Sequence, residues 1–284
     1  MWITIGIILG CLLLWAVGDV LYDIHTFRVT SYCFKSAKIR QPFRFVMLSD
    51  LHNKEFGKNN NRLLEQIRKL SPDAVLIAGD LLTAKAGESV EPAADLVEAL
   101  AQEYPVYYGL GNHEQRLERS QKLAKMQEEY WKRLDAADVH PLSDEDRLLI
   151  EHGVRIYGLS LDKKYYQRFH NVPMSESYLT EKLGIADKSH YVILLAHNPD
   201  YFRDYCKWGA DLVLSGHNHG GIVRLPFFGG VISPKCTLFP KYDAGRFEKD
   251  KTTMLLSRGL GTHTLPIRLL NHAELLYVEL LPEK

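Results

Sequence analysis

The sequence predicts an α/β fold in which two β-sheets pack face to face and are flanked by helices, with a hydrophobic helix at the N-terminus. Three observations support this fold. Short apolar runs typical of buried strands alternate with helical spacing in the first half of the chain, and the second half is richer in strands. Several of these runs end in polar blocks, as expected where loops at the carboxyl ends of strands converge on one crevice.

The first residues predict a membrane anchor over residues 1–24. No charged side chain occurs from Trp2 to Val17, and the run consists mainly of Ile, Leu, Trp and Val. A spanning helix needs about 20 apolar residues, so the run is slightly short unless residues 20–22 extend it. A cleaved signal peptide or a buried helix stays open as an alternative, although a signal peptide normally begins with a basic segment, which this chain lacks.

The charges that follow this segment predict its orientation. Four basic residues come after it, and the other side carries only the terminal amine. They are Arg28, Lys35, Lys38 and Arg40. The positive-inside rule therefore places the body of the protein in the cytoplasm. The opposite orientation stays open, because large domains are translocated despite such charges.

Residues 25–41 are expected to form a linker or an edge strand over 27–32, and residues 42–284 a single catalytic domain. No stretch rich in Pro, Gly or Ser divides that region. The predicted strands are 43–48, 74–78, 106–110, 155–161, 191–196, 212–215, 253–257 and 275–280, and the predicted helices are 61–70 and 92–103.

Composition excludes several classes of protein. The 284 residues hold 35 Lys+Arg and 35 Asp+Glu, so no net charge favours nucleic acid as a partner. The four cysteines include no Cys-x-x-Cys pair, which argues against a thiolate zinc site or a dense disulfide framework. The sequence predicts no oligomeric state.

Five polar blocks supply metal ligands. Each follows or ends an apolar run, and together they contain carboxylates, an amide and imidazoles. The candidate ligands are Asp50, His52, Asp80, Asn112, His197, His217 and His219. This set is large enough for two metal ions side by side, a common arrangement for hydrolysing phosphate esters. The alternative is a structural single-zinc site made by the three later histidines, which leaves two aspartates and the asparagine unexplained.

His113 directly follows Asn112, and adjacent residues do not easily bind one ion together. We therefore assign Asn112 to a metal and His113 to the substrate, as an acid for the leaving oxygen or as a stabiliser of charge on phosphorus. A surface histidine in a loop is the alternative for His113. For Asp80, which follows a glycine, the alternative is a helix N-cap or a turn.

The ordered set Asp-x-His, Gly-Asp, Gly-Asn-His-Glu, His and Gly-His-x-His resembles the calcineurin-like metallophosphoesterase superfamily from Phe43 onward. The resemblance implies one metal on Asp50, His52 and His219. It implies a second metal on Asn112, His197 and His217, with Asp80 bridging and His113 as the catalytic histidine. It also implies in-line attack on phosphorus by a metal-bridging water or hydroxide. Manganese, iron and zinc all suit such mixed nitrogen and oxygen ligands.

Within the superfamily the chain is similar to a bacterial, membrane-associated, phosphodiesterase-like branch. The likeness rests on the N-terminal segment, Gly220-Gly221 and the stretches 257–261 and 266–268. It implies a membrane-tethered phosphoesterase that cleaves a phosphodiester or pyrophosphate bond, with lipid-linked or nucleotide-linked substrates in some relatives.

A phosphatase and a non-catalytic scaffold are the two alternative functions. Glu114 also occurs in protein phosphatases, but the Asp-Arg-Gly of those enzymes is absent after Gly79-Asp80, which disfavours a phosphomonoesterase or protein phosphatase. A non-catalytic metal-binding scaffold would have lost ligands, and here every expected position is filled.

Two residues are candidate substrate contacts. Arg224 lies in the unusually apolar loop 222–232, where Phe227 and Phe228 are expected to face an acyl chain or the bilayer. Packing of this loop on the fold's own core is the alternative. Asn53, which follows His52, is the second candidate contact. Basic and aromatic residues between 163 and 190 form a candidate rim, namely Tyr165, Tyr166, Arg168 and His170, and His263 is a further candidate near the site.

Overall fold

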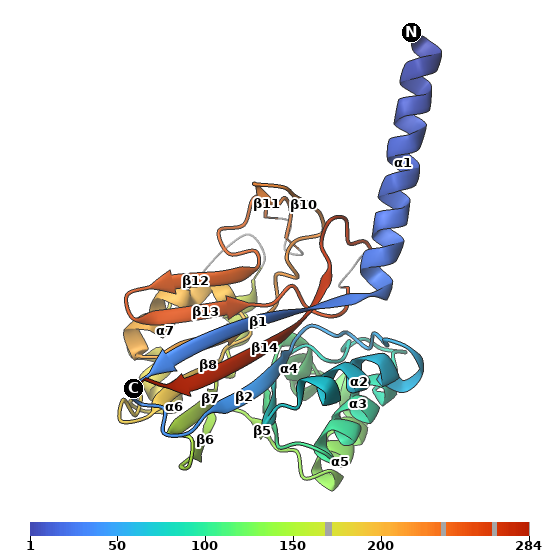
Figure 1. Cartoon of the computed structure of the whole chain (residues 1–284). Helices are drawn as coiled ribbons and strands as arrows, with labels where there is room; N and C mark the ends of the chain where they lie inside the picture. Colours follow the sequence, from blue (N-terminus) through green and yellow to red (C-terminus); the bar gives the residue numbers. More distant parts are fainter. Residues whose placement is uncertain (168–171, 234–236, 263–265, 284) are drawn as a thin grey trace.

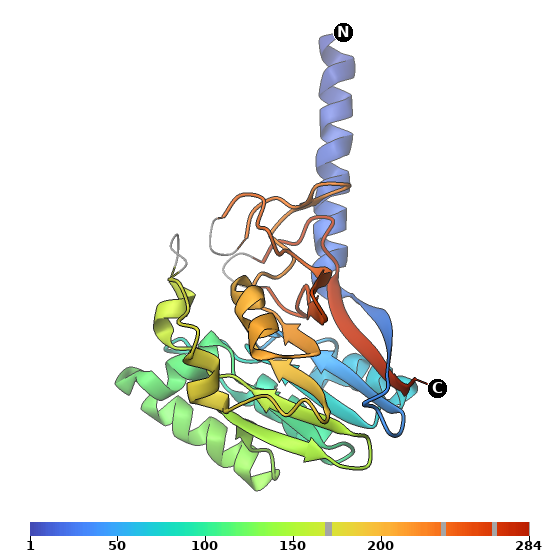
Figure 2. The ribbon, with the colours of Figure 1, turned by 90° about the vertical axis from the view of Figure 1, so that its left-hand side faces the viewer.

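The computed structural model describes residues 1–167, 172–233, 237–262 and 266–283. Helix α1 (Trp2–His25) stands away from a body built of two layered sheets (Figures 1 and 2). Its 24 residues correspond to about 36 Å at a rise of about 1.5 Å per residue, against about 30 Å of bilayer hydrocarbon. The helix is therefore long and apolar enough to cross a membrane.

The first sheet has six strands. In spatial order they are β1 (Phe27–Ser36), β14 (Ala273–Pro282), β2 (Phe43–Leu48), β3 (Ala74–Ala78), β4 (Val106–Gly109) and β5 (Pro141–Leu142). Strands β2, β3 and β4 are parallel. Strand β1 pairs in parallel with β14 along its whole length, so the predicted linker or edge segment contains an edge strand of this sheet.

The second sheet also has six strands. Their order is β12 (Gly245–Lys249), β13 (Thr252–Leu256), β9 (Leu212–Ser215), β8 (Tyr191–Leu195), β7 (Val154–Gly158) and β6 (Glu145–Leu149). The four inner strands are parallel, and the two edge strands pair antiparallel. Strands β6 and β12 were not predicted, because their side chains are mostly exposed and they lack an apolar run.

Helices cover both outer faces. On the first sheet lie α2 (Asn61–Leu70), α3 (Glu91–Ala101), α4 (Asn112–Arg119) and α5 (Ala124–Ala136), and on the second lie α6 (Tyr178–Leu183) and α7 (Phe202–Trp208). A third apolar core lies between the sheets, where Met47 and Leu76 pack with Ile156 and Ile193. The predicted sandwich is confirmed, and the ends of the predicted elements lie within four residues of those observed.

The layering brings the ends of the parallel strands together. The amide of Asp50, after β2, donates to the carbonyl of Gly79, after β3, at 3.0 Å. The amide of Gly216, after β9, donates to the carbonyl of His197, after β8, at 3.0 Å. Beyond this edge the chain forms a short hairpin of β10 (Arg224–Leu225) and β11 (Gly229–Gly230).

Candidate metal centre

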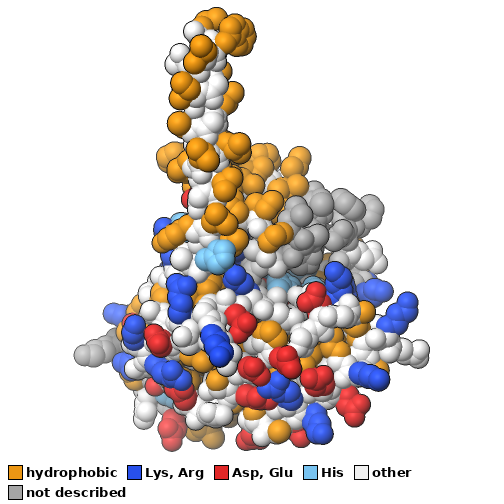
Figure 3. Space-filling model, turned by 90° about the vertical axis from the view of Figure 1, so that its right-hand side faces the viewer, with side chains coloured by type: hydrophobic (Ala, Val, Ile, Leu, Met, Phe, Trp, Pro, Cys, Tyr) orange, Lys and Arg blue, Asp and Glu red, His pale blue; other side chains and the backbone are white. Residues whose placement is uncertain are grey.

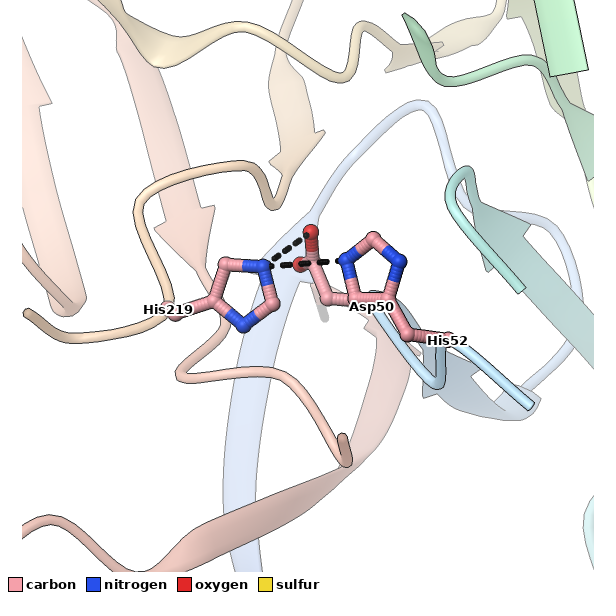
Figure 4. Close-up of side chains that lie close together, drawn as sticks. All are labelled: Asp50, His52 and His219. Atoms are coloured by element: carbon pink, nitrogen blue, oxygen red, sulfur yellow. Dashed lines mark hydrogen bonds and ion pairs between the residues drawn. The ribbon is translucent and has the colours of Figure 1, made fainter. Parts of the chain in front are cut away.

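The predicted ligands converge at the edge where the strands end. Three overlapping groups each place their ligand atoms within 4.8 Å of one another. They are Asp50 with His52 and His219, His52 with Asp80 and His113, and Asp80 with His197 and His217. The first group is drawn in Figure 4. Asp80 belongs to two of the groups, so its carboxylate lies between the Asp50 side and the His197 side.

The backbone at these ligands is unusual. Five of them have φ between +50° and +75°, a region that non-glycine residues rarely adopt. They are Asp50, His52, Asp80, His217 and His219. Such conformations cost about 1–3 kcal/mol each and are typically kept at functional sites, because tight turns there aim side chains at one point.

Local hydrogen bonds orient the carboxylate of Asp50. The hydroxyl of Ser49 donates to Oδ2 at 2.5 Å, and the amide of His217 donates to Oδ1 at 2.9 Å. Gly216 lies directly over this pair, since a Cβ there would overlap both Oγ of Ser49 and Oδ2 of Asp50. The loop after β9 therefore packs on the loop after β2 through a glycine.

We expect Gly216→Ala to lower phosphoesterase activity by about 100-fold, because the added methyl must displace the carboxylate of Asp50. Purified protein would be assayed for kcat/KM and for bound metal. Gly87→Ala is the control, since a Cβ there meets nothing within 4 Å, although Gly87, unlike Gly216, has a positive φ of +89°. Equal loss in both variants would contradict the explanation by overlap with Asp50.

Hydrogen bonding through one ring nitrogen orients the candidate ligand His197. Its Nδ1 donates to the carbonyl of Ala78 at 2.6 Å, which leaves Nε2 directed at Oδ2 of Asp80 at 3.2 Å. Burial alone would lower the pKa of His197, but the carboxylates of Asp80 and Asp50 raise it to about 10. Burial would raise the pKa of Asp80, yet the surrounding histidines, His197 first, hold it well below its usual range.

His113 has a defined tautomer. The amide of Ala84 donates to its Nδ1 at 3.0 Å, so in the neutral ring the hydrogen is on Nε2. The ring of His113 lies edge-on to that of His52 with centroids 4.8 Å apart. His113 is therefore beside the ligand cluster and has a hydrogen-bond donor on Nε2.

Asn112 begins α4 and lines the same cavity as His113 and His217. Its amide oxygen is buried and accepts no hydrogen bond from the residues that the structure describes. A buried amide oxygen that accepts no hydrogen bond can instead coordinate a cation. Together with the carboxylates and imidazoles, it forms a donor set that fits divalent metal ions.

Glu114 is a residue whose role the sequence did not predict. Its carboxylate accepts hydrogen bonds from the amides of Asp80 (2.8 Å), Leu81 (2.9 Å) and Gly111 (2.9 Å), and from the hydroxyl of Tyr108 (2.8 Å). Burial and the nearby Asp80 raise the pKa of Glu114 to about 7. Glu114 thus fixes the loop that carries Asp80. Its place three residues after Gly111, as in a capping box, is the sequence signal that could have identified it.

The motif at 257–261 packs against the loop after β2 that carries Asp50. The amide of Leu260 donates to the carbonyl of Ser49 at 3.0 Å, and the amide of Gly261 donates to the carbonyl of Asp50 at 2.7 Å. Arg268 is fully buried and donates to carbonyls of this motif, among them that of Gly259 at 3.0 Å. The stretches 257–261 and 266–268 therefore support the metal loops.

Asn271 is a second residue that the sequence analysis missed. Its buried amide nitrogen donates to the carbonyls of His219 at 2.8 Å and Gly221 at 2.5 Å. A single asparagine outside any ligand motif gives no sequence signal for this role. Asn271 fixes the end of the histidine loop, which we define as residues 216–221.

A cavity of about 1320 Å³ opens beside the cluster. His52, Asn112, His113, His217 and Tyr166 contribute to its wall. The charged residues that line it are Lys85, Arg116, Arg119, Lys163 and Lys164, with Glu88 as the acidic one. The wall is thus strongly basic, although the chain as a whole is neutral.

The two predicted substrate contacts lie elsewhere. Asn53 donates from Nδ2 to the carbonyl of Ser89 at 2.8 Å, and the guanidinium of Arg224 pairs with Asp243 at 3.0 Å. Neither residue lines the cavity, so the structure does not bring them together with the ligands. Of the predicted rim, Tyr166 packs edge-on against His217 with ring centroids 5.3 Å apart. Arg168, His170 and His263 lie outside the described residues.

A sequence profile described as calcineurin-like phosphoesterase matches residues 43–221, more than half of the chain. The chain belongs to the calcineurin-like phosphoesterase family. It is therefore a metal-dependent phosphoric ester hydrolase, in agreement with the resemblance carried by its five ligand blocks.

Two relatives and one solved structure illustrate the similarity. The uncharacterized metallophosphoesterase YkuE of Bacillus subtilis is 38% identical over 85 residues, which cover 30% of this chain and 29% of that protein. The phosphodiesterase YaeI of Escherichia coli is 24% identical over 230 residues, which cover 78% of this chain and 76% of that one. A 5'-nucleotidase precursor from Thermus thermophilus superposes with a TM-score of 0.47 at 15% identity, covering 78% of this chain and 49% of its own.

Proposed function

We propose that the protein is a membrane-tethered, two-metal hydrolase of phosphodiester or pyrophosphate bonds. Residues 1–24 form its anchor, residues 25–41 form the connection that contributes β1, and residues 42–284 form the catalytic domain. Because basic residues follow the helix, we expect the catalytic domain to lie in the cytoplasm. The observation that carries the proposal is the convergence of the ligand groups around Asp80, beside a histidine that bears a proton on Nε2.

We assign the metals as the family resemblance implies. One ion would be held by Asp50, His52 and His219, and Asp80 would be shared. The second ion would be held by Asn112, His197 and His217. Bound divalent ions would neutralise charge on the phosphoryl oxygens and supply an activated water.

The residues of the chain perform the remaining tasks. The Nε2–H of His113 hydrogen-bonds to the oxygen that leaves phosphorus and stabilises the charge that develops on it, while the amide of Ala84 keeps Nδ1 engaged and the ring oriented. Glu114 keeps Asp80 in place through the backbone amides at that turn. Tyr166 closes one wall of the cavity against His217.

The basic wall supports a substrate with negative charge beyond the scissile phosphate. Arg116 and Arg119 on α4 and Lys163 and Lys164 opposite contribute four positive charges to the cavity. A diphosphate or a phosphodiester with an anionic leaving group would be attracted, because a concave site of one charge concentrates the opposite charge. The name of the relative YaeI, a phosphodiesterase, also favours diesters over monoesters.

The test is a comparison of bis(p-nitrophenyl) phosphate with p-nitrophenyl phosphate, using full-length protein in detergent. We expect diester hydrolysis that falls about 100-fold or more after chelation and dialysis and that returns with Mn²⁺, since the metals contribute several kcal/mol of transition-state stabilisation. A preference for the monoester would favour the phosphatase alternative. Undiminished activity in the stripped protein, with metal content checked by mass spectrometry, would refute the two-metal site.

A further inference from the structure

Large apolar side chains are exposed on the loops beyond the metal site. Phe227 and Phe228, at the tip of the β10–β11 hairpin, have relative exposures of 105% and 73%. Leu225, Leu238, Phe239 and Ile267 are also exposed. Single exposed apolar residues are ordinary on protein surfaces, but a group of this size normally marks a contact surface.

Backbone hydrogen bonds join these loops into one unit, which we call the α1-side loops and define as residues 222–233, 237–239 and 266–272. The amide of Phe239 donates to the carbonyl of Val231 at 2.8 Å, and Ile232 forms a β-bridge with Leu238. The amide of Arg224 donates to the carbonyl of Leu269 at 3.0 Å. The exposed side chains therefore share one support.

The α1-side loops are bound to the N-terminal helix. A carboxylate oxygen of Asp19 accepts the amide of Leu270 at 2.7 Å, and one of Asp23 accepts the amide of Asn271 at 2.7 Å. Asp23 is the buried residue of α1, and its second oxygen pairs with His272. The lower end of the helix is thus joined to the loops by specific contacts.

The position of the hairpin follows from the two ribbon views, which differ by a turn about the vertical axis. In both, the β10–β11 hairpin rises above the lower end of α1 and lies on the same side of the body as the helix (Figures 1 and 2). A bilayer crossed by α1 would therefore meet the hairpin before it met the sheets.

The charges on this side agree with that position. In the described part of the α1-side loops the Lys, Arg, Asp and Glu side chains are Arg224 and Arg268, and both are turned inward. Hydrophobic side chains gather around the foot of the helix, whereas acidic and basic side chains crowd the opposite end of the body (Figure 3). This distribution matches an apolar medium on one side and water on the other.

The hairpin is also held firmly. Arg224 donates to the carbonyl of Gly220 at 2.9 Å and pairs with Asp243, whose Oδ2 in turn accepts the amide of Gly230 at 2.7 Å. These contacts fix the base of the hairpin while its tip, with Phe227 and Phe228, points away from the body. The arrangement argues against packing of the two phenylalanines on the fold's own core.

We propose that the α1-side loops rest in the interface of the same bilayer that α1 crosses, with Phe227 and Phe228 inserted among the lipids. This inference rests on the proposed membrane tether. His217 and Thr262 line the cavity, and the segments 222–233 and 266–272 follow these two residues in the chain by five and four positions, so we expect the cavity to open near this surface. The site consequently takes phosphate esters carried by lipids of that bilayer.

Contact is tested with full-length protein in phosphatidylcholine–phosphatidylglycerol nanodiscs that contain doxyl lipid. A fluorophore is attached at Phe228→Cys in a chain whose native cysteines are serine, and the control label is at Ile150→Cys, an exposed apolar site in the turn between β6 and β7. We expect strong quenching at position 228 and little at position 150. Equally weak quenching at both positions would overturn the proposal. Weak quenching at position 228 together with the mass of a dimer in size-exclusion light scattering would also overturn it, because the partner copy would then cover this surface.

Substrate access is tested with Phe227→Ser/Phe228→Ser. We expect hydrolysis of a lipid phosphodiester in the nanodisc to fall about tenfold, because two interfacial anchors are lost, while bis(p-nitrophenyl) phosphate is cleaved as before. Ile185→Ser, another exposed apolar position, is the control and should change neither rate. Equal loss on both substrates would contradict the lipid role. Because quenching needs no turnover, it separates failure of this inference from failure of the proposed hydrolase.

Discussion

Replacing Asp80 with asparagine should lower kcat/KM for the diester by about 1,000-fold or more, the largest effect that we expect from one substitution. The carboxylate is buried, it is shared by two ligand groups, and it lies 3.2 Å from Nε2 of His197. An amide of the same shape removes the negative charge that both ions would share. It also turns donor hydrogens toward the neighbouring ligands.

Activity and bound metal should be measured on the same preparation of Asp80→Asn. We expect less than two equivalents of metal, together with an unchanged far-UV circular dichroism spectrum. Asp138→Asn, at an almost fully exposed carboxylate, serves as the control and should match the parent protein. Full activity with two metals in Asp80→Asn would refute the bridging role.

Replacing His113 with alanine should lower kcat on an alkyl phosphodiester by about 10²–10³-fold, the loss typical of removing one donor that stabilises a developing oxyanion. Loss should be much smaller for a p-nitrophenyl ester, because p-nitrophenolate is a stable anion that needs little stabilisation by a hydrogen bond. This contrast follows from the tautomer, since the amide of Ala84 occupies Nδ1 and Nε2 carries the hydrogen.

Metal analysis separates two roles of His113, because the residue also lies within reach of His52 and Asp80. Removal of a hydrogen-bond donor to the substrate leaves the metal content unchanged, whereas removal of a metal ligand lowers it. His140→Ala, at an exposed histidine, is the control. Equal loss on good and poor leaving groups, accompanied by lost metal, would show that His113 acts as a ligand.

Sequence alone was sufficient for the parallel strands and the polar residues that end them. Buried strands such as 74–78 and 191–195 are continuous apolar runs, and a ligand needs a definite side chain at a definite place in a loop. Both features can be read residue by residue. The family and the sandwich fold followed from the order of these blocks, and both are confirmed.

The edge strands and the supporting residues could not be obtained in this way. Strands β6 and β12 bear exposed polar side chains, so their pairing depends on a neighbour rather than on their own pattern. The contact of Arg224 also depends on a residue that is distant in the sequence. An arginine after a glycine-rich histidine loop fits a phosphate contact, yet its partner Asp243 lies 19 positions further along the chain and is found only in the folded protein.

The amino-acid sequence by itself determined which chemical groups the protein brings to phosphate esters, because ligand type and strand pattern are local properties. Tertiary structure alone decided how those groups are held and what surrounds them. Glu114 fixes the Asp80 turn, Asn271 fixes the histidine loop, and Asp23 ties both the loop and its apolar surface to α1. These contacts join residues up to 248 positions apart, and their strength comes from burial and geometry that exist only after the chain has folded.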